Sequence, residues 1–99
     1  MSKLKLNITD RAKEDINLIT EYIAKDNTKA AKAMSKYLYK ICLTLADYPN
    51  IGTIRPDFTY KDFRFYVIKK HYIIAYKTDE TNIYISRVLS GYQDICMLL

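Results

Sequence analysis

The C-terminal half of the chain carries side chains that could together cleave RNA without a metal ion. These side chains belong to Arg64, His71, Arg87 and Tyr92. Such cleavage needs a base for the 2′-hydroxyl, an acid for the leaving oxygen, and cations for the charge of the transition state. Each residue also has an ordinary structural role. Strand arginines often pair with carboxylates such as Asp62 or Asp94, and a histidine at a hairpin turn is commonly solvated. Both interpretations stay open at the level of the sequence.

Four lysines in the middle of the chain form a second candidate site. They are Lys29, Lys32, Lys36 and Lys40. Their spacing of three or four residues places them on one face of a helix, and no acidic residue occurs between residues 29 and 46. The sequence has 16 Lys+Arg against 11 Asp+Glu, and its net charge of +5 favours an acidic partner, either nucleic acid or protein. A solvated face without a partner is the other interpretation.

The remaining residue types exclude several functional classes. Cys42 and Cys96 lie far apart, and with one histidine they are too few for a usual zinc site, which takes about four Cys or His ligands. The two glycines, Gly52 and Gly91, are isolated and cannot build a phosphate-binding loop. No apolar run reaches the roughly 18 residues of a membrane span. We therefore expect a cytoplasmic protein with free, buried thiols, no metal, no cofactor and no membrane contact.

The periodicity of the apolar residues predicts the elements that position these candidates. A period of two predicts a strand over residues 3–8, and a period of 3.6 predicts helices over residues 11–25 and 29–46. Residues 51–61 are predicted to form a loop because they contain Gly52, Pro56 and Asp57. The period of two then returns and predicts three strands, at residues 63–68, 72–77 and 82–89. Their short connections make these strands an antiparallel meander.

The two helices are predicted to form an antiparallel hairpin, because only two or three residues separate them. Thr9 and Asp10 offer N-cap oxygens to the first helix, and residues 26–28 supply the cap of the second. The apolar stripe of the first helix is Ala12, Ile16, Ile19 and Ile23. The apolar stripe of the second helix is Ala30, Met34, Tyr37, Leu38, Ile41 and Leu45.

The order β-α-α-β-β-β predicts an α+β fold with one domain over residues 1–99. In this fold the helical hairpin packs on a small, mainly antiparallel sheet and buries its apolar stripe there. Arg87 shares its strand parity with Ile83, Ile85 and Leu89. It therefore faces the core side of the sheet unless a bulge intervenes.

Several short motifs, taken in order, resemble one known family over nearly the whole chain. The motifs are EYIA (21–24), NTKAA (27–31), LADYP (45–49), FR (63–64), YIIAY (72–76) and ISRVLSG (85–91). Gly52 and Arg55 follow the third motif, and Asp94 follows the last. In this order and spacing, the chain resembles the ParE branch of the RelE/ParE toxins of bacterial toxin–antitoxin systems.

The resemblance implies a toxic cytoplasmic protein and a cognate antitoxin that neutralises it by tight wrapping, through the sheet and the groove beside the helices. For the ParE branch it implies inhibition of DNA gyrase with cleaved DNA trapped, which is poisoning of another enzyme and not catalysis. For the RelE branch it implies cutting of messenger RNA at the ribosome. Arg64 and Arg87 match strand arginines of the family, of which the ribonuclease members use counterparts. A homodimer or a toxin–antitoxin heterotetramer is the assembly that we expect.

The departures from the family pattern favour the ParE-like alternative. Family members often carry a histidine before the glycine and a basic residue soon after it, where this chain has Ser90 and Gln93. Tyr92 is the one residue near the place of the ribonucleases' C-terminal acid–base group. Our first hypothesis is therefore a gyrase inhibitor without catalytic residues. The alternatives are a metal-independent, ribosome-dependent mRNA endonuclease that uses Arg64, His71, Arg87 and Tyr92, and an interaction module without toxicity. The predicted target or antitoxin surface comprises Lys29, Lys32, Lys36, Lys40, Arg64, Arg87 and Tyr92.

Overall fold

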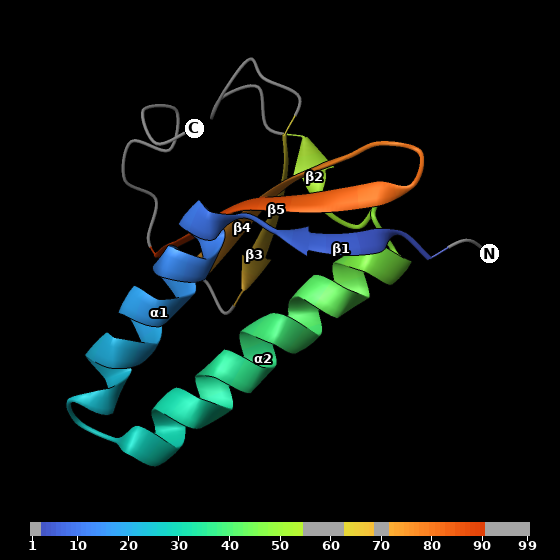
Figure 1. Cartoon of the computed structure of the whole chain (residues 1–99). Coiled ribbons are helices and arrows are strands. Elements are labelled where there is room, and N and C mark those ends of the chain that lie inside the picture. The colour runs from blue at the N-terminus through green and yellow to red at the C-terminus, as the bar shows by residue number, and fades with distance from the viewer. Residues whose placement is uncertain (1–2, 55–62, 69–71, 91–99) are drawn as a thin grey trace.

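The fold consists of a strand, a helical hairpin and a second run of strands (Figure 1). The computed structural model describes residues 3–54, 63–68 and 72–90. The helices are α1 (Asp10–Ala24) and α2 (Thr28–Asp47). The strands are β1 (Lys5–Ile8), β2 (Thr53–Ile54), β3 (Arg64–Ile68), β4 (Tyr72–Thr78) and β5 (Asn82–Ser90). This arrangement confirms the predicted α+β fold.

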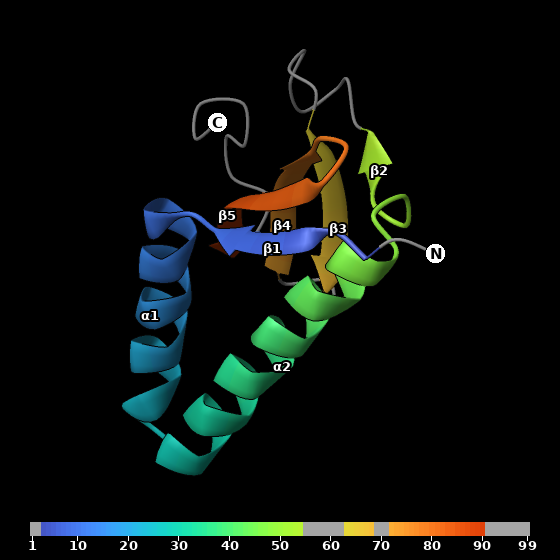
Figure 2. The same cartoon turned by 45° about the vertical axis from the view of Figure 1, so that its right-hand side comes forward.

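The strands form one sheet in the order β1-β5-β4-β3-β2 (Figure 2). β1 runs parallel to β5, and the other pairs are antiparallel, as a meander requires. The short strand β2 lies inside the region that we predicted as a loop, so the loop prediction is wrong at Thr53 and Ile54. These two residues pair with Phe65 and Arg64 of β3. Two residues are too few to show a period of two, so the apolar pattern could not predict this strand. It is recognised as a strand only by its pairing with β3.

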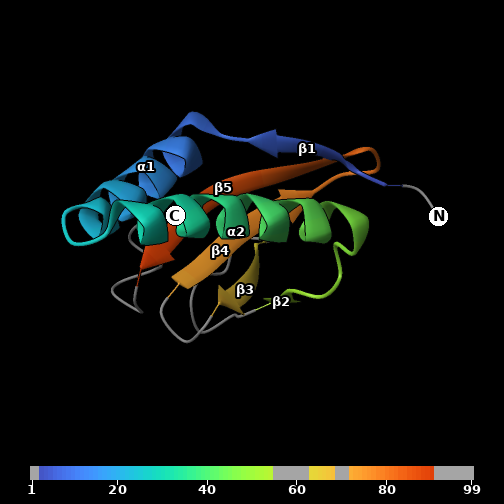
Figure 3. The same cartoon turned by 90° about the horizontal axis from the view of Figure 1, so that it is seen from below.

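Both helices begin at the predicted cap residues. The Thr9 hydroxyl oxygen accepts a hydrogen bond from the Ala12 N–H at 3.2 Å, and the Asn27 side-chain oxygen accepts one from the Ala30 N–H at 3.0 Å. The helices meet at the short turn between them and both lie on one side of the sheet (Figures 1 and 3). In the view from below, α2 lies in front of the sheet, between the viewer and strands β5 and β4 (Figure 3). The protein therefore has two layers with the main core between them.

The core confirms most of the predicted helical stripes. Ala12, Leu38 and Leu45 are fully buried between the helices and the sheet. The prediction is wrong for one residue of the second helix, since Ala30 is exposed and Ala31 is buried instead. The first turns of α2 face α1 and not the sheet, and Ala31 lines a hollow there together with Ala24 of α1.

The sheet also carries apolar residues on the face opposite the helices. Phe63, Phe65, Ile73, Ala75 and Leu89 form a second buried cluster. Cys42 lies in the main core as a free thiol, and its burial raises its pKa to about 11. Cys96 lies outside the described residues. Within the described part of the chain, no helix has the length and hydropathy to cross a bilayer.

Candidate functional site

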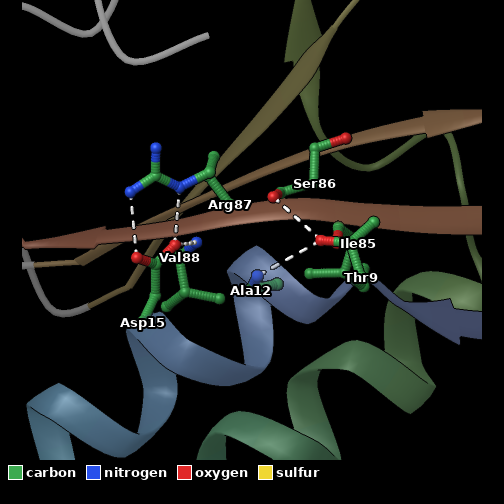
Figure 4. Close-up of polar contacts among 7 residues, drawn as sticks. All are labelled: Thr9, Ala12, Asp15, Ile85, Ser86, Arg87 and Val88. Carbon is green, nitrogen blue, oxygen red and sulfur yellow. Dashed lines mark hydrogen bonds and ion pairs between the residues drawn. The ribbon is translucent and has the colours of Figure 1, made fainter.

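Arg87, a candidate from the sequence, makes a two-pronged ion pair with Asp15 of α1 (Figure 4). Its Nε lies 2.7 Å from one carboxylate oxygen of Asp15, and its Nη2 lies 2.9 Å from the other. The two side chains are 13% and 12% exposed. The hydrogen bonds that Arg87 donates to Asp15 raise the pKa of the guanidinium further above its ordinary value. The geometry is that of a strong, charge-assisted pair.

This pair lies where β5 extends past the end of β1. β1 ends at Ile8, opposite Ile85, and beyond that point no strand of the described residues pairs with the outer backbone groups of β5. The start of α1 supplies partners instead (Figure 4). The Thr9 hydroxyl donates to the carbonyl oxygens of Ile85 and Ser86 at 2.9 and 3.1 Å. The Asp15 carboxylate accepts the Val88 N–H at 3.0 Å, so Asp15 holds both the backbone and the arginine.

A β-bulge in β5 decides which face Arg87 occupies. Across the strand pair, Tyr76 lies opposite Ile85 and Ala75 lies opposite Arg87, so Ser86 is the extra residue. The bulge shifts the alternation of side chains by one residue. Ile85 and Val88 therefore both face the helices. The Arg87 side chain therefore leaves the strand on the other face, as the sequence analysis expected if a bulge intervened, and its guanidinium reaches Asp15 of α1 at the edge of the sheet.

Arg64, the second strand arginine, holds the segment that connects α2 to β2. Its Nη1 donates to the carbonyl oxygen of Gly52 at 2.8 Å. The buried Tyr76 hydroxyl accepts the Gly52 N–H at 2.9 Å and donates to the carbonyl oxygen of Pro49 at 2.7 Å. A Cβ atom at position 52 would lie only 2.7 and 2.8 Å from ring atoms of Tyr76, so the close approach requires glycine. Burial raises the pKa of the Tyr76 hydroxyl.

The structure does not bring the two arginines together into one site. Arg64 lies opposite Tyr76, which faces the helices, whereas Arg87 lies opposite Ala75, which faces the other side. Residues directly opposite each other in an antiparallel pair project from the same face of the sheet. The two arginines therefore leave the sheet on opposite faces. His71 and Tyr92, the other two members of the predicted nuclease site, lie outside the described residues.

The sequence analysis missed Asp15 as a functional partner. It named Asp62 and Asp94 as carboxylates for the strand arginines, and both lie outside the described residues. One signal for Asp15 was present, since it follows Ala12 by three residues and precedes Ile19 by four. A carboxylate on this apolar side of a helix requires a buried partner.

The lysines of α2 form a face separate from both arginines. Lys29, Lys32, Lys36 and Lys40 are all exposed. The acidic residue of this helix is Asp47 in its last turn, whose carboxylate lies 3.6 Å from the Lys3 Nζ atom. The four lysines therefore share one exposed, positively charged face of α2. Among the described residues, no group of three or more His, Cys, Asp or Glu side chains could hold a metal ion.

Comparisons with known proteins identify the family of this chain. Residues 6–95 match the model of the ParE toxin of type II toxin–antitoxin system, parDE. The chain therefore belongs to the ParE toxin family. A solved structure described as the chromosomal ParDE TA system from P. aeruginosa has the same fold, with a TM-score of 0.74 and 17% sequence identity. The alignment covers 91% of this chain and 98% of the other. No curated protein matches the chain at a significant level.

Proposed function

We propose that this protein is a toxin that inhibits DNA gyrase in the cytoplasm and is neutralised by a cognate antitoxin. Membership of the ParE toxin family supports the toxin role. The observation that carries the choice of gyrase over RNA cleavage is the pairing of Arg87 with Asp15. The toxin would act by binding its target, with no chemical step of its own.

Arg87 is poorly suited to stabilise the transition state of RNA cleavage. A catalytic arginine must meet the charge that develops on the phosphate. Here Nε and Nη2 of Arg87 already donate to a mostly buried carboxylate, which also accepts the Val88 N–H. A phosphate would have to displace this carboxylate, and removal of one partner from a buried pair costs about 3–5 kcal/mol. The position of Arg64 adds to the difficulty, because it lies two strands away on β3 and donates to the Gly52 carbonyl oxygen, whereas the Arg87 guanidinium is held against α1.

The exposed lysine face of α2 is our proposed contact surface for gyrase or for the antitoxin. It carries positive charge from Lys29 to Lys40, and α2 has no acidic residue before Asp47. Such a surface speeds association with an acidic partner. Arg64 and Arg87 would support the surrounding surface through the contacts that they make within the protein.

The proposal is tested by gyrase assays with the purified full chain. We expect the protein to inhibit supercoiling of relaxed plasmid and to raise the amount of cleaved DNA in a dose-dependent manner. The test variant reverses the charge of two lysines on the α2 face, Lys32→Glu and Lys36→Glu, and should weaken inhibition. The control variant Lys25→Glu reverses a charge between the helices and should inhibit as the wild type does.

Transcript mapping after induction in cells distinguishes the alternatives. Unaffected gyrase together with newly cleaved messages would overturn the proposal in favour of a RelE-like endonuclease. Harmless expression without any antitoxin would overturn it in favour of an interaction module. Growth arrest with intact messages and damaged DNA is the expected outcome.

A further inference from the structure

The lysine face of α2 lies on the side of the helix that points away from the sheet. The buried residues of α2, among them Leu38 and Leu45, pack against the sheet. With 3.6 residues per turn, the lysines fall on the other side of the helix, and all four are exposed. In the view from below, α2 lies in front of the sheet (Figure 3). A large partner can therefore approach this face along its length.

The composition of the face fits nucleic acid better than protein. A protein interface has an apolar centre in which lysine is depleted. Interfaces with DNA are more polar and much more positively charged. The large apolar side chains nearest to the face, Tyr39 and Leu43, lie toward β1 and line a separate hollow there. The lysine face thus offers positive charge without the apolar centre that a protein partner would need.

The spacing of the lysines suits a row of phosphates. Successive lysines are three or four residues apart, and the row from Lys29 to Lys40 spans about 16 Å along the helix axis. Each strand of DNA carries one phosphate per about 3.4 Å of axis, so a row of this length meets several phosphates. A lysine ammonium group on its flexible stem binds phosphate as a point charge. The contact therefore needs no fixed register.

Acidic side chains near the face lie toward its two ends. Glu21 of α1 lines a hollow together with Lys32, and Asp26 is exposed in the turn before α2. At the other end, the Asp47 carboxylate lies 3.6 Å from the Lys3 Nζ atom. Lys36 and Lys40 lie at least one further turn of α2 from each of these carboxylates, so their charge is opposed least.

We propose that the lysine face of α2 binds the phosphate backbone of double-stranded DNA without reading its sequence. The ammonium groups neutralise phosphates of the duplex, with Lys36 and Lys40 contributing most. This proposal deepens the proposed function, because gyrase presents bound DNA together with its own surface. The identification of the DNA as the segment that gyrase holds rests on that function. The affinity of the face for DNA does not.

The test is fluorescence anisotropy of a short labelled duplex titrated with the purified full chain. Between about 50 and 200 mM salt, the logarithm of the binding constant should fall against the logarithm of the salt concentration with a slope of about −3 to −4, since each neutralised phosphate contributes about −0.9. Two duplexes of unrelated sequence should bind equally, because phosphate contacts carry no sequence information. No binding at the lowest salt concentration would overturn the proposal.

Paired variants assign the binding to this face. Lys36→Gln combined with Lys40→Gln should reduce the size of the salt slope by about 2 and weaken binding by about tenfold or more. Lys5→Gln combined with Lys25→Gln removes the same charge from exposed positions off the face and should leave the slope unchanged. Equal losses in the two double variants would indicate attraction by net charge alone and would overturn the assignment.

A polyglutamate peptide distinguishes DNA from an acidic protein. It should displace the duplex poorly, because it matches the charge of DNA at a lower density. Tighter binding of the peptide than of the duplex would mean that the face serves an acidic protein, and would overturn the proposal. No gyrase is present in these measurements. Their failure would leave the gyrase assay unaffected, and a failed gyrase assay would leave the DNA contact standing.

Discussion

Two neighbouring stretches of the same sheet edge differ in how their backbone groups are satisfied. Where β5 extends past β1, the side chains of Thr9 and Asp15 bond to its backbone, and Arg87 completes the contact. Along β1, the outer backbone groups of Leu6 and Ile8 have no backbone partner among the described residues, and a hollow of about 400 Å³ that Tyr39 and Leu43 help to line lies beside them. The first stretch is closed by the protein's own side chains, and the second is available to another chain.

The difference shows how a small sheet can combine stability with binding. A buried backbone N–H such as that of Val88 must be bonded, because an unsatisfied group costs about 1–3 kcal/mol. An exposed edge can instead be solvated until a partner arrives. The closed stretch is therefore expected to govern stability, and the open stretch is expected to govern recognition. Substitutions of Asp15 and Tyr39 test this division, and Tyr76, on the other side of the sheet, provides a comparison.

The largest effect is expected from Asp15→Ala, which breaks the closed stretch. The variant removes the Asp15 carboxylate, which accepts from the Arg87 guanidinium and the Val88 N–H, and we expect a loss of about 3 kcal/mol in the free energy of unfolding. Urea unfolding followed by circular dichroism measures it. Glu14→Ala, an exposed neighbour on the same helix, should change stability by less than about 0.5 kcal/mol.

A second substitution tests whether the loss comes from the guanidinium charge that Asp15 no longer balances. Adding Arg87→Met to Asp15→Ala should restore part of the stability, since the largely buried guanidinium is then removed as well. Equal losses in Asp15→Ala and Glu14→Ala would show that the ion pair does not hold the edge.

An intermediate effect is expected from Tyr76→Phe, at the opposite side of the sheet. The variant removes the hydroxyl bonds to Gly52 and Pro49 and should cost about 1–2 kcal/mol in unfolding free energy at neutral pH. Tyr84→Phe is the control, because the Tyr84 hydroxyl donates at 3.3 Å to an exposed carboxylate, that of Asp79. A loss in Tyr84→Phe as large as that in Tyr76→Phe would contradict the buried contact.

The same variant has a pH signature. Burial raises the pKa of Tyr76 in the folded protein, whereas a tyrosine in the unfolded chain has a pKa of about 10. The contribution of Tyr76 to stability is therefore complete below about pH 10 and is lost as the pH rises through the folded pKa. Stability measured from neutral to alkaline pH should fall less steeply in Tyr76→Phe than in the wild type. Parallel curves would show that this hydroxyl ionises equally in both states.

The smallest effect on stability is expected at the open stretch. Tyr39→Ser should change the unfolding free energy by less than about 0.5 kcal/mol, because Tyr39 is half exposed in the free protein. Tyr22→Ser is the control on α1, where the side chain is 74% exposed outside the hollow, and it should change stability as little. A large stability loss in Tyr39→Ser would mean that the hollow belongs to the core.

Much of the fold could be predicted because its signals are local. The caps at Thr9 and Asn27 and the stripes of both helices depend on residues within a few turns of each other. The three strands of the meander follow from a period of two and short connections. The strand at Thr53 and Ile54 could not be predicted in this way, because only its pairing with β3 makes it a strand.

The candidate site was less predictable because its contacts join distant parts of the chain. Arg87 was found from its type and motif, but its partner Asp15 lies 72 residues away. The sequence placed Arg64 and Arg87 in one possible nuclease site. The register of β4 against its two neighbours separates them onto opposite faces.

The sequence by itself determined the element order, the helix caps, the apolar faces and the resemblance to the ParE toxins, since each is encoded in short-range pattern. The tertiary structure alone decided the parallel pairing of β1 with β5, the bulge at Ser86 and the burial of Asp15 against Arg87. These features depend on how the helical hairpin packs along the sheet edge. That packing closes one stretch of the edge and leaves the other open, because α1 begins where β1 ends while β5 continues.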